Sequence, residues 1–253
     1  MQTPADLVDS LQTKMSDIND YTFAALELDY ENKLTREHTK RIFSSALLSA
    51  VTEWQSFTVD WITLSIKNDP AEVYELISKK KSGVISGETG IKLSVPVTRP
   101  NNTVPAIKFM LEGHRSGDFR VNWKSDWDAY SPLLAGGYKA AVDGLSVADF
   151  ALINLTTALR NMVGHQSTPS VKTFNTEMRR PSSRRAKRGA ANPPLTGDDR
   201  HQLVRTTEVN GSRGTSGHYL YAKAKLEVPN GFSRTRLGYI LFRLDMIAEK
   251  LRV

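Results

Sequence analysis

Residues 146–165 read SVADFALINLTTALRNMVGH, and this stretch decides the fold class. It opens with Ser-x-x-Asp, a capping box in which Ser146 and Asp149 satisfy free N–H groups at a helix start. Apolar residues then recur at the three- and four-residue spacing of one helix face. We therefore expect a largely buried helix that starts at Ser146 and that Gly164 terminates, because glycine is favoured just beyond helix ends.

Three further segments carry the same pattern. Residues 3–28 contain Pro4, which fits the first turn of a helix, and apolar residues at helical spacing follow it. Residues 35–67 have a wide apolar face, and residues 233–252 are strongly amphipathic. Together these segments predict a mainly α fold.

The remaining regions break this pattern. Residues 84–145 include a short alternation of apolar and polar residues and many turn residues, so we expect an irregular or β insertion. Residues 169–200 are rich in Pro, Ser and Arg and predict a loop or linker. In residues 201–253 the alternation around Tyr219 predicts a β-hairpin, followed by the amphipathic helix. The expected division is a helical domain over 1–168 with this insertion, the linker, and a C-terminal part that completes the fold.

Composition limits the classes of function. The chain has 253 residues, of which 40% are hydrophobic and 24% charged, as in soluble globular proteins. It has no cysteine, which excludes disulfides and thiolate metal sites and suits a reducing cytoplasm. No apolar run reaches the roughly 18 residues of a membrane helix, so we expect no membrane partner. A net charge of +7 favours a polyanion such as RNA as partner.

The polar residues Arg160, Asn161 and His165 end the 146–165 segment. Asn161 and His165 are four residues apart and share a helix face, whereas Arg160 lies about 140° from His165 in a regular helix. We expect Gly164 to relax the helix and let the imidazole approach the other two groups. Three groups suffice to cleave RNA without metal: an arginine that binds phosphate, an amide that orients a neighbouring group, and a histidine that titrates near neutrality. The other interpretation is an ordinary helix end, where the helix dipole favours basic groups.

The run Arg160-Asn161-Met162-Val163-Gly164-His165 resembles the RNxxxH motif of the HEPN superfamily (higher eukaryotes and prokaryotes nucleotide-binding). Residues 35–68 are similar to the HEPN helix that carries an acidic residue in an apolar run followed by an aromatic, here Glu53. The resemblance covers residues 35–68 and 146–168. It implies an antiparallel helical bundle and assigns catalytic roles to Arg160, Asn161, His165 and Glu53. Glu53 also fits an ordinary solvated or ion-paired position.

The resemblance implies a metal-independent endoribonuclease that works by 2′-hydroxyl attack, in a toxin, phage-defence or RNA-processing role. Family members commonly act as dimers, so we expect a homodimer with a composite site. A cognate antitoxin or a defence-complex subunit is a further candidate partner. No metal or cofactor is expected, since no other histidine has a partner at metal-ligand spacing. Two alternatives stay open: a non-catalytic RNA- or nucleotide-binding module, and a structural dimerisation protein that uses the C-terminal part.

A basic segment spans residues 179–188 within the predicted linker. Six basic residues in this segment suit either an arm along the RNA backbone or a solvated loop. They are Arg179, Arg180, Arg184, Arg185, Lys187 and Arg188.

Overall fold

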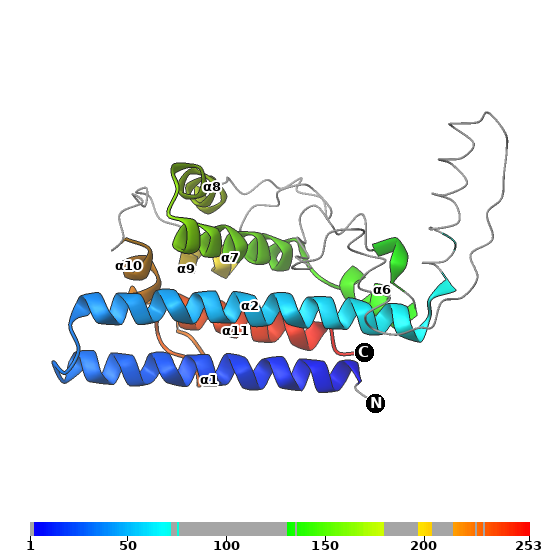
Figure 1. The fold of residues 1–253 in the computed structure, drawn as a ribbon, viewed down its shortest axis with the longest axis horizontal. Coiled ribbons are helices and arrows are strands. Elements are labelled where there is room, and N and C mark those ends of the chain that lie inside the picture. Colours follow the sequence, from blue (N-terminus) through cyan, green and yellow to red (C-terminus); the bar gives the residue numbers. More distant parts are fainter. Residues whose placement is uncertain are drawn as a thin grey trace.

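The computed structural model (Figure 1) describes residues 3–71, 75, 131–134, 136–179, 197–203, 215–225, 227–229 and 231–253. Within these residues the only β contact is an isolated bridge between Lys223 and Thr235, so the mainly α class is confirmed. The elements are α1 (Pro4–Tyr30), α2 (Arg36–Asn68), η1 (Ser131–Leu133), α6 (Gly136–Asp143), α7 (Val147–His165), α8 (Thr168–Arg179), α9 (Gly197–Leu203), α10 (Thr215–Tyr221) and α11 (Arg236–Lys250).

The long helices α1 and α2 form an antiparallel hairpin that runs the length of the molecule (Figure 1). Thr3 and Asp6 form a capping box at the start of α1, with Pro4 in its first turn. Thr35 caps α2 by accepting a hydrogen bond from the backbone N–H of His38. Both helices begin where the sequence predicts.

Helix α2 lies between α1 and α7, and α11 packs beside it (Figure 1). The buried indole of Trp61 in α2 donates a hydrogen bond of 3.0 Å to the carbonyl oxygen of Leu251, which ties α2 to the end of α11. The apolar stripe of α11, which includes Leu241 and Leu244, is fully buried. The predicted helix of residues 233–252 is therefore confirmed, with α11 as its regular part.

The C-terminal end of the predicted insertion, where the structure describes residues 136–143, belongs to the helical core. Helix α6 buries Tyr138 and Val142, and the Tyr138 ring packs edge-on to Trp61 with centroids 5.0 Å apart. The expectation of irregular structure is therefore wrong for residues 136–143, while residues 84–130 lie outside the described residues. Among the residues that are described, no single helix is long and apolar enough to cross a membrane. Helices α6 and α7 reach that length and apolarity only when taken together, and the chain bends by 85° between them.

The predicted linker over 169–200 is helical at both ends. Helix α8 occupies its first part and buries Phe174 and Met178 completely, and α9 begins at Gly197. The two buried residues are four apart, a helical spacing that the surrounding polar residues obscure. Residues 180–196 lie outside the described residues.

The predicted β-hairpin is wrong where the structure describes it. Residues 215–221 form α10, in which the neighbours Tyr219 and Leu220 are both fully buried, against the alternation that a strand requires. Helix α10 lies so close to α2 that a Cβ atom on Gly217 would collide with the backbone carbonyl of Lys40. This long-range packing overrides the local alternation from which the strand was inferred.

Candidate functional site

Helix α7 is buried around most of its circumference and open along one side of its C-terminal half. Between Asp149 and Val163 every residue is buried apart from Thr157, Arg160 and Asn161, which are half-buried. Gly164 and His165 follow and are exposed. These five positions have the spacing i, i+3, i+4, i+7 and i+8, which places them along one side of the helix. We call Thr157, Arg160, Asn161, Gly164 and His165 the α7 strip.

Two of the three candidate side chains in the α7 strip contact each other. Nη1 of Arg160 donates a hydrogen bond of 3.1 Å to Oδ1 of Asn161. Asn161 and His165 are one turn apart on the same face, so this bond holds the guanidinium on the side of the helix that carries the imidazole. In the part of the chain that the structure describes, no carboxylate lies within ion-pair distance of Arg160 or His165. Among these residues, the side chain that accepts a hydrogen bond from Arg160 is the neutral Asn161.

The end of α7 differs from the expectation. Gly164 is helical, and the left-handed residue that ends the helix is Gln166, with φ 48°. The N–H of Gln166 donates to the carbonyl of Met162 at 3.0 Å and so closes the last turn. The prediction that Gly164 terminates the helix and frees the imidazole is therefore wrong. In this regular helix Arg160 and His165 remain about 140° apart around the axis.

The space around Gly164 does not require a glycine. A Cβ atom there would have the Leu48 Cδ2 atom of α2 as its nearest neighbour, at 3.9 Å, which is ordinary van der Waals contact. Its φ is not positive, so the backbone does not require glycine either. Glycine costs a helix up to about 1 kcal/mol relative to alanine, the full value applying to a helix interior, and Gly164 lies in the last turn. No packing contact requires Gly164, and it leaves the α7 strip without a side chain beside Asn161.

Glu53 lies on a different side of α2. Its carboxylate forms an ion pair with Lys14 of α1. Leu48, the α2 residue nearest to Gly164, is five positions earlier and thus about 140° around α2 from Glu53. The structure therefore brings Arg160, Asn161 and His165 onto one strip and directs Glu53 towards α1.

The basic segment continues from α8. Arg179 is the last residue of that helix, and α8 packs against α7. The other five residues of the predicted arm lie outside the described residues: Arg180, Arg184, Arg185, Lys187 and Arg188. The described residues contain no group of three or more histidine, cysteine or acidic side chains placed to hold a metal ion.

A buried ionic network fixes the other end of α7, and sequence reasoning did not find it. Asp149 is fully buried and accepts hydrogen bonds from Lys250 Nζ at 2.7 Å and from Arg243 Nη2 at 3.1 Å. Arg243 also pairs with Asp199 of α9 at 2.7 Å, and the Tyr239 hydroxyl donates to the same carboxylate at 2.7 Å. The network joins α7, α9 and α11.

The network shifts the pKa values of its members. Burial alone would raise the pKa of Asp149, but hydrogen bonds from Lys250 and Ser146 outweigh it and hold that pKa below its ordinary value. Burial, together with the neighbouring Asp199 carboxylate, raises the pKa of Tyr239. A signal for this network was present in the sequence, because Arg243 stands within the apolar stretch of α11, but its partners lie far away along the chain.

No protein-family model, curated protein or solved structure matches the chain.

Proposed function

We propose that the chain is a metal-independent endoribonuclease of HEPN type whose site is the α7 strip. The observation that carries this proposal is the grouping of a hydrogen-bonded Arg160–Asn161 pair with an exposed His165 on the one open side of a buried helix. A rigid element that leaves a cationic fork, an amide and an imidazole facing solvent has the group types that phosphodiester cleavage requires.

Each side chain has a distinct role in the proposed reaction. Arg160 binds the scissile phosphate and stabilises the charge that develops on its oxygens. Asn161 positions the guanidinium through the 3.1 Å hydrogen bond. The RNA 2′-oxygen attacks phosphorus and the bond from phosphorus to the 5′-oxygen breaks, which leaves a 2′,3′-cyclic phosphate. A base removes the 2′-hydroxyl proton and an acid protonates the 5′-oxygen, and His165 performs one of these transfers.

The second proton transfer needs a group that a single α7 strip lacks. A two-fold dimer that apposes two α7 strips would supply a second His165 and a second Arg160, so we propose a homodimer with a composite site. The exposure of His165 at a helix end leaves it accessible to such a partner strip. A cytoplasmic toxin, phage-defence or RNA-processing enzyme, with or without a cognate antitoxin, is the corresponding biological role.

Gly164 completes the proposed site. Because Gly164 has no side chain, the surface beside Asn161 stays open between Arg160 and His165, and an RNA phosphate can approach the helix backbone there. This accounts for a glycine at a position where alanine would fit and would stabilise α7.

A non-catalytic RNA- or nucleotide-binding module is the second candidate. The observation that favours it is the regular geometry of α7, which keeps Arg160 and His165 about 140° apart within one chain. Such a strip binds a phosphate through Arg160 without the convergent groups of a complete active site.

The deciding experiment incubates the purified full-length protein with a defined single-stranded RNA in excess EDTA. We expect cleavage with 2′,3′-cyclic phosphate ends, identified by mass spectrometry, and loss of cleavage in His165→Ala. His201→Ala removes another exposed histidine, on α9, and should cleave normally. RNA binding without cleavage by the wild type would favour the second candidate, and cleavage that persists in His165→Ala would exclude the proposed site.

A further inference from the structure

An exposed side of α2 lies next to the α7 strip. Helices α2 and α7 pack against each other and run antiparallel (Figure 1), and Leu48 is the α2 residue nearest to Gly164. Three exposed residues of α2 lie within about 60° of Leu48 around the helix axis. They are Arg41, Ser45 and Thr52, and we call them the α2 strip. Because Leu48 faces Gly164, the α2 strip and the α7 strip lie side by side.

The antiparallel packing decides how the two strips are aligned. Thr52, one turn after Leu48, is level with Arg160, one turn before Gly164. Arg41 lies in the other direction, about 10 Å from Leu48 along the axis and past the C-terminal end of α7. The distance along α2 from the level of Arg160 to Arg41 is about 16 Å. The combined surface is therefore longer than a single phosphate group.

The chain segments that meet at this contact lack acidic residues. Residues 38–52 and 150–176 contain no aspartate or glutamate. Their lysine and arginine residues are Lys40, Arg41, Arg160 and Lys172. Glu37, one turn before Arg41, forms an ion pair of 2.6 Å with Lys40, so these three side chains together carry a charge of +1. The face that carries the two strips is therefore cationic.

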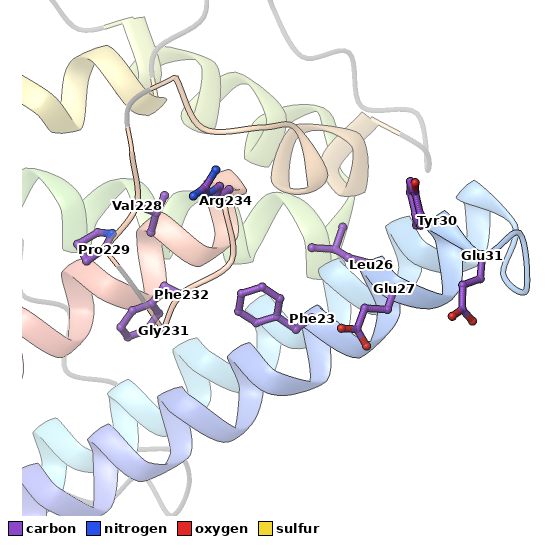
Figure 2. Close-up of a pocket in the computed structure, with 10 residues that line it drawn as sticks. All are labelled: Phe23, Leu26, Glu27, Tyr30, Glu31, Val228, Pro229, Gly231, Phe232 and Arg234. Carbon is purple, nitrogen blue, oxygen red and sulfur yellow. The ribbon is translucent and has the colours of Figure 1, made fainter.

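The side of the molecule formed by α1, across α2 from α7, carries the opposite charge. From Pro4 to Glu31 the chain has seven acidic residues and one lysine, whereas the whole protein carries +7. Figure 2 shows Glu27 and Glu31 on α1 beside a pocket of about 740 Å³. Among the described residues that line this pocket, Arg234 is the only cation. A polyanion is therefore repelled along α1 and attracted to the face that carries the strips.

We propose that an RNA strand crosses from the α7 strip onto the α2 strip, and that Arg41 binds a phosphate of its backbone. The proposal rests on the proposed ribonuclease function, because the strand is the substrate whose scissile phosphate Arg160 binds. The hydroxyl groups of Ser45 and Thr52 line the path between the two arginines. Arginine, serine and threonine side chains are common partners of nucleic-acid phosphates, and such contacts fix the register of the strand without reading its sequence.

The test measures the binding of a fluorescent single-stranded RNA to the full-length His165→Ala variant by anisotropy, over a range of salt concentrations. This background prevents the proposed cleavage, so affinity is read independently of activity. Each phosphate contact on a single strand contributes about 0.7 to the slope of log affinity against log salt. We expect Arg41→Gln to lower the slope by about 0.7, which corresponds to binding about eightfold weaker at 50 mM salt when referred to 1 M.

Arg36→Gln is the matched control for Arg41→Gln. Arg36 is an exposed arginine of the same helix, five residues earlier and thus about 140° around the axis, where it lines a pocket with Asp29 and Tyr221. Its replacement changes the net charge of the protein by the same amount and should leave the slope unchanged.

A second pair of variants adds a carboxylate instead of removing a cation. Ser45→Glu on the α2 strip should weaken RNA binding at 50 mM salt, because it places a negative charge beside the phosphates. Ser16→Glu on the exposed face of α1 should leave binding unchanged. Circular dichroism of all four variants should match that of the His165→Ala background, since every altered side chain is exposed.

Three results would overturn the proposal: an unchanged slope in Arg41→Gln, an equal loss of slope in Arg36→Gln, or equal weakening by Ser16→Glu and Ser45→Glu. Its failure is distinct from that of the proposed function. RNA that binds through Arg41 but is not cleaved by the wild type would refute the cleavage and retain the binding surface. Cleavage by the wild type together with binding that does not depend on Arg41 would refute the α2 strip alone, and a protein that binds no RNA would refute both.

Discussion

Replacing Gly164 with alanine separates the structural role of α7 from its proposed chemistry. The new methyl group would have Leu48 Cδ2 as its nearest neighbour at 3.9 Å, and the backbone there is not left-handed. Gly164 lies in the last turn of α7, where the gain from glycine to alanine is at most the about 1 kcal/mol of a helix interior. For a chain of this length that upper limit corresponds to a rise in Tm of roughly 2–4 °C. We expect Gly164→Ala to be the more stable protein.

The same methyl group would stand between Arg160 and His165, where the RNA phosphate is proposed to approach. We expect kcat/KM for RNA cleavage in EDTA to fall on the order of ten- to a hundredfold, because small displacements of a reacting group are costly. Thermal unfolding followed by circular dichroism and cleavage of a defined RNA are measured on the same preparations. Ser16→Ala, which also raises helix propensity but lies on the exposed face of α1, should retain full activity. Full activity in Gly164→Ala, or a lower Tm, would refute the reasoning.

Further changes test the other parts of the site and fold. His165→Ala and Arg160→Ala should each lower the rate of RNA cleavage by about 10²–10⁴-fold with little change in Tm, because neither side chain is fully buried; normal cleavage would refute the assignment. Deletion of residues 179–188 should weaken RNA binding and flatten the plot of log affinity against log salt, and an unchanged slope would exclude the arm as a backbone contact. Activity per protomer should fall on dilution below the dimer dissociation constant, and full activity of a monomeric species in light scattering would refute the shared site. Asp149→Asn should lower the free energy of unfolding at pH 7 by about 3 kcal/mol in urea titrations. Folding lowers the pKa of Asp149, so this stabilisation is present above the unfolded pKa, near 3.8, and is lost as the pH falls through the folded pKa. A difference in unfolding free energy between wild type and Asp149→Asn that stays constant below pH 4 would contradict this account.

Local rules were sufficient to predict four of the helices that contribute to the core: α1, α2, α7 and α11. The capping box at Ser146 placed the start of α7, and the apolar face of residues 35–67 placed α2, each to within a residue of the observed start. These signals act over a few residues, so they are readable without knowledge of the fold. The same reasoning failed at α10, where Gly217 packs against α2 and Tyr219 against Arg236 of α11, contacts that no local pattern contains.

In the candidate site, too, local patterns predicted some features and missed those that depend on long-range packing. Helical periodicity correctly indicated that Asn161 and His165 share a face, and the structure adds that this face is the open one. Periodicity also placed Glu53 near the apolar side of its helix. It could not show which neighbouring helix the carboxylate would meet, since that depends on how α1 packs, and the partner proved to be Lys14.

The geometry of α7 makes Asn161 the residue on which the proposed site depends. Along a regular helix Arg160 and His165 are separated by about 7.5 Å in rise as well as 140° in rotation. The network around Asp149 at one end and the Gln166 cap at the other fix α7, so helix distortion does not reduce this separation. The hydrogen bond from Arg160 to Asn161 links the guanidinium to the residue one turn before His165 on the same face. A phosphate bound there would face one imidazole from its own chain, and the second proton transfer would have to come from the strip of a partner.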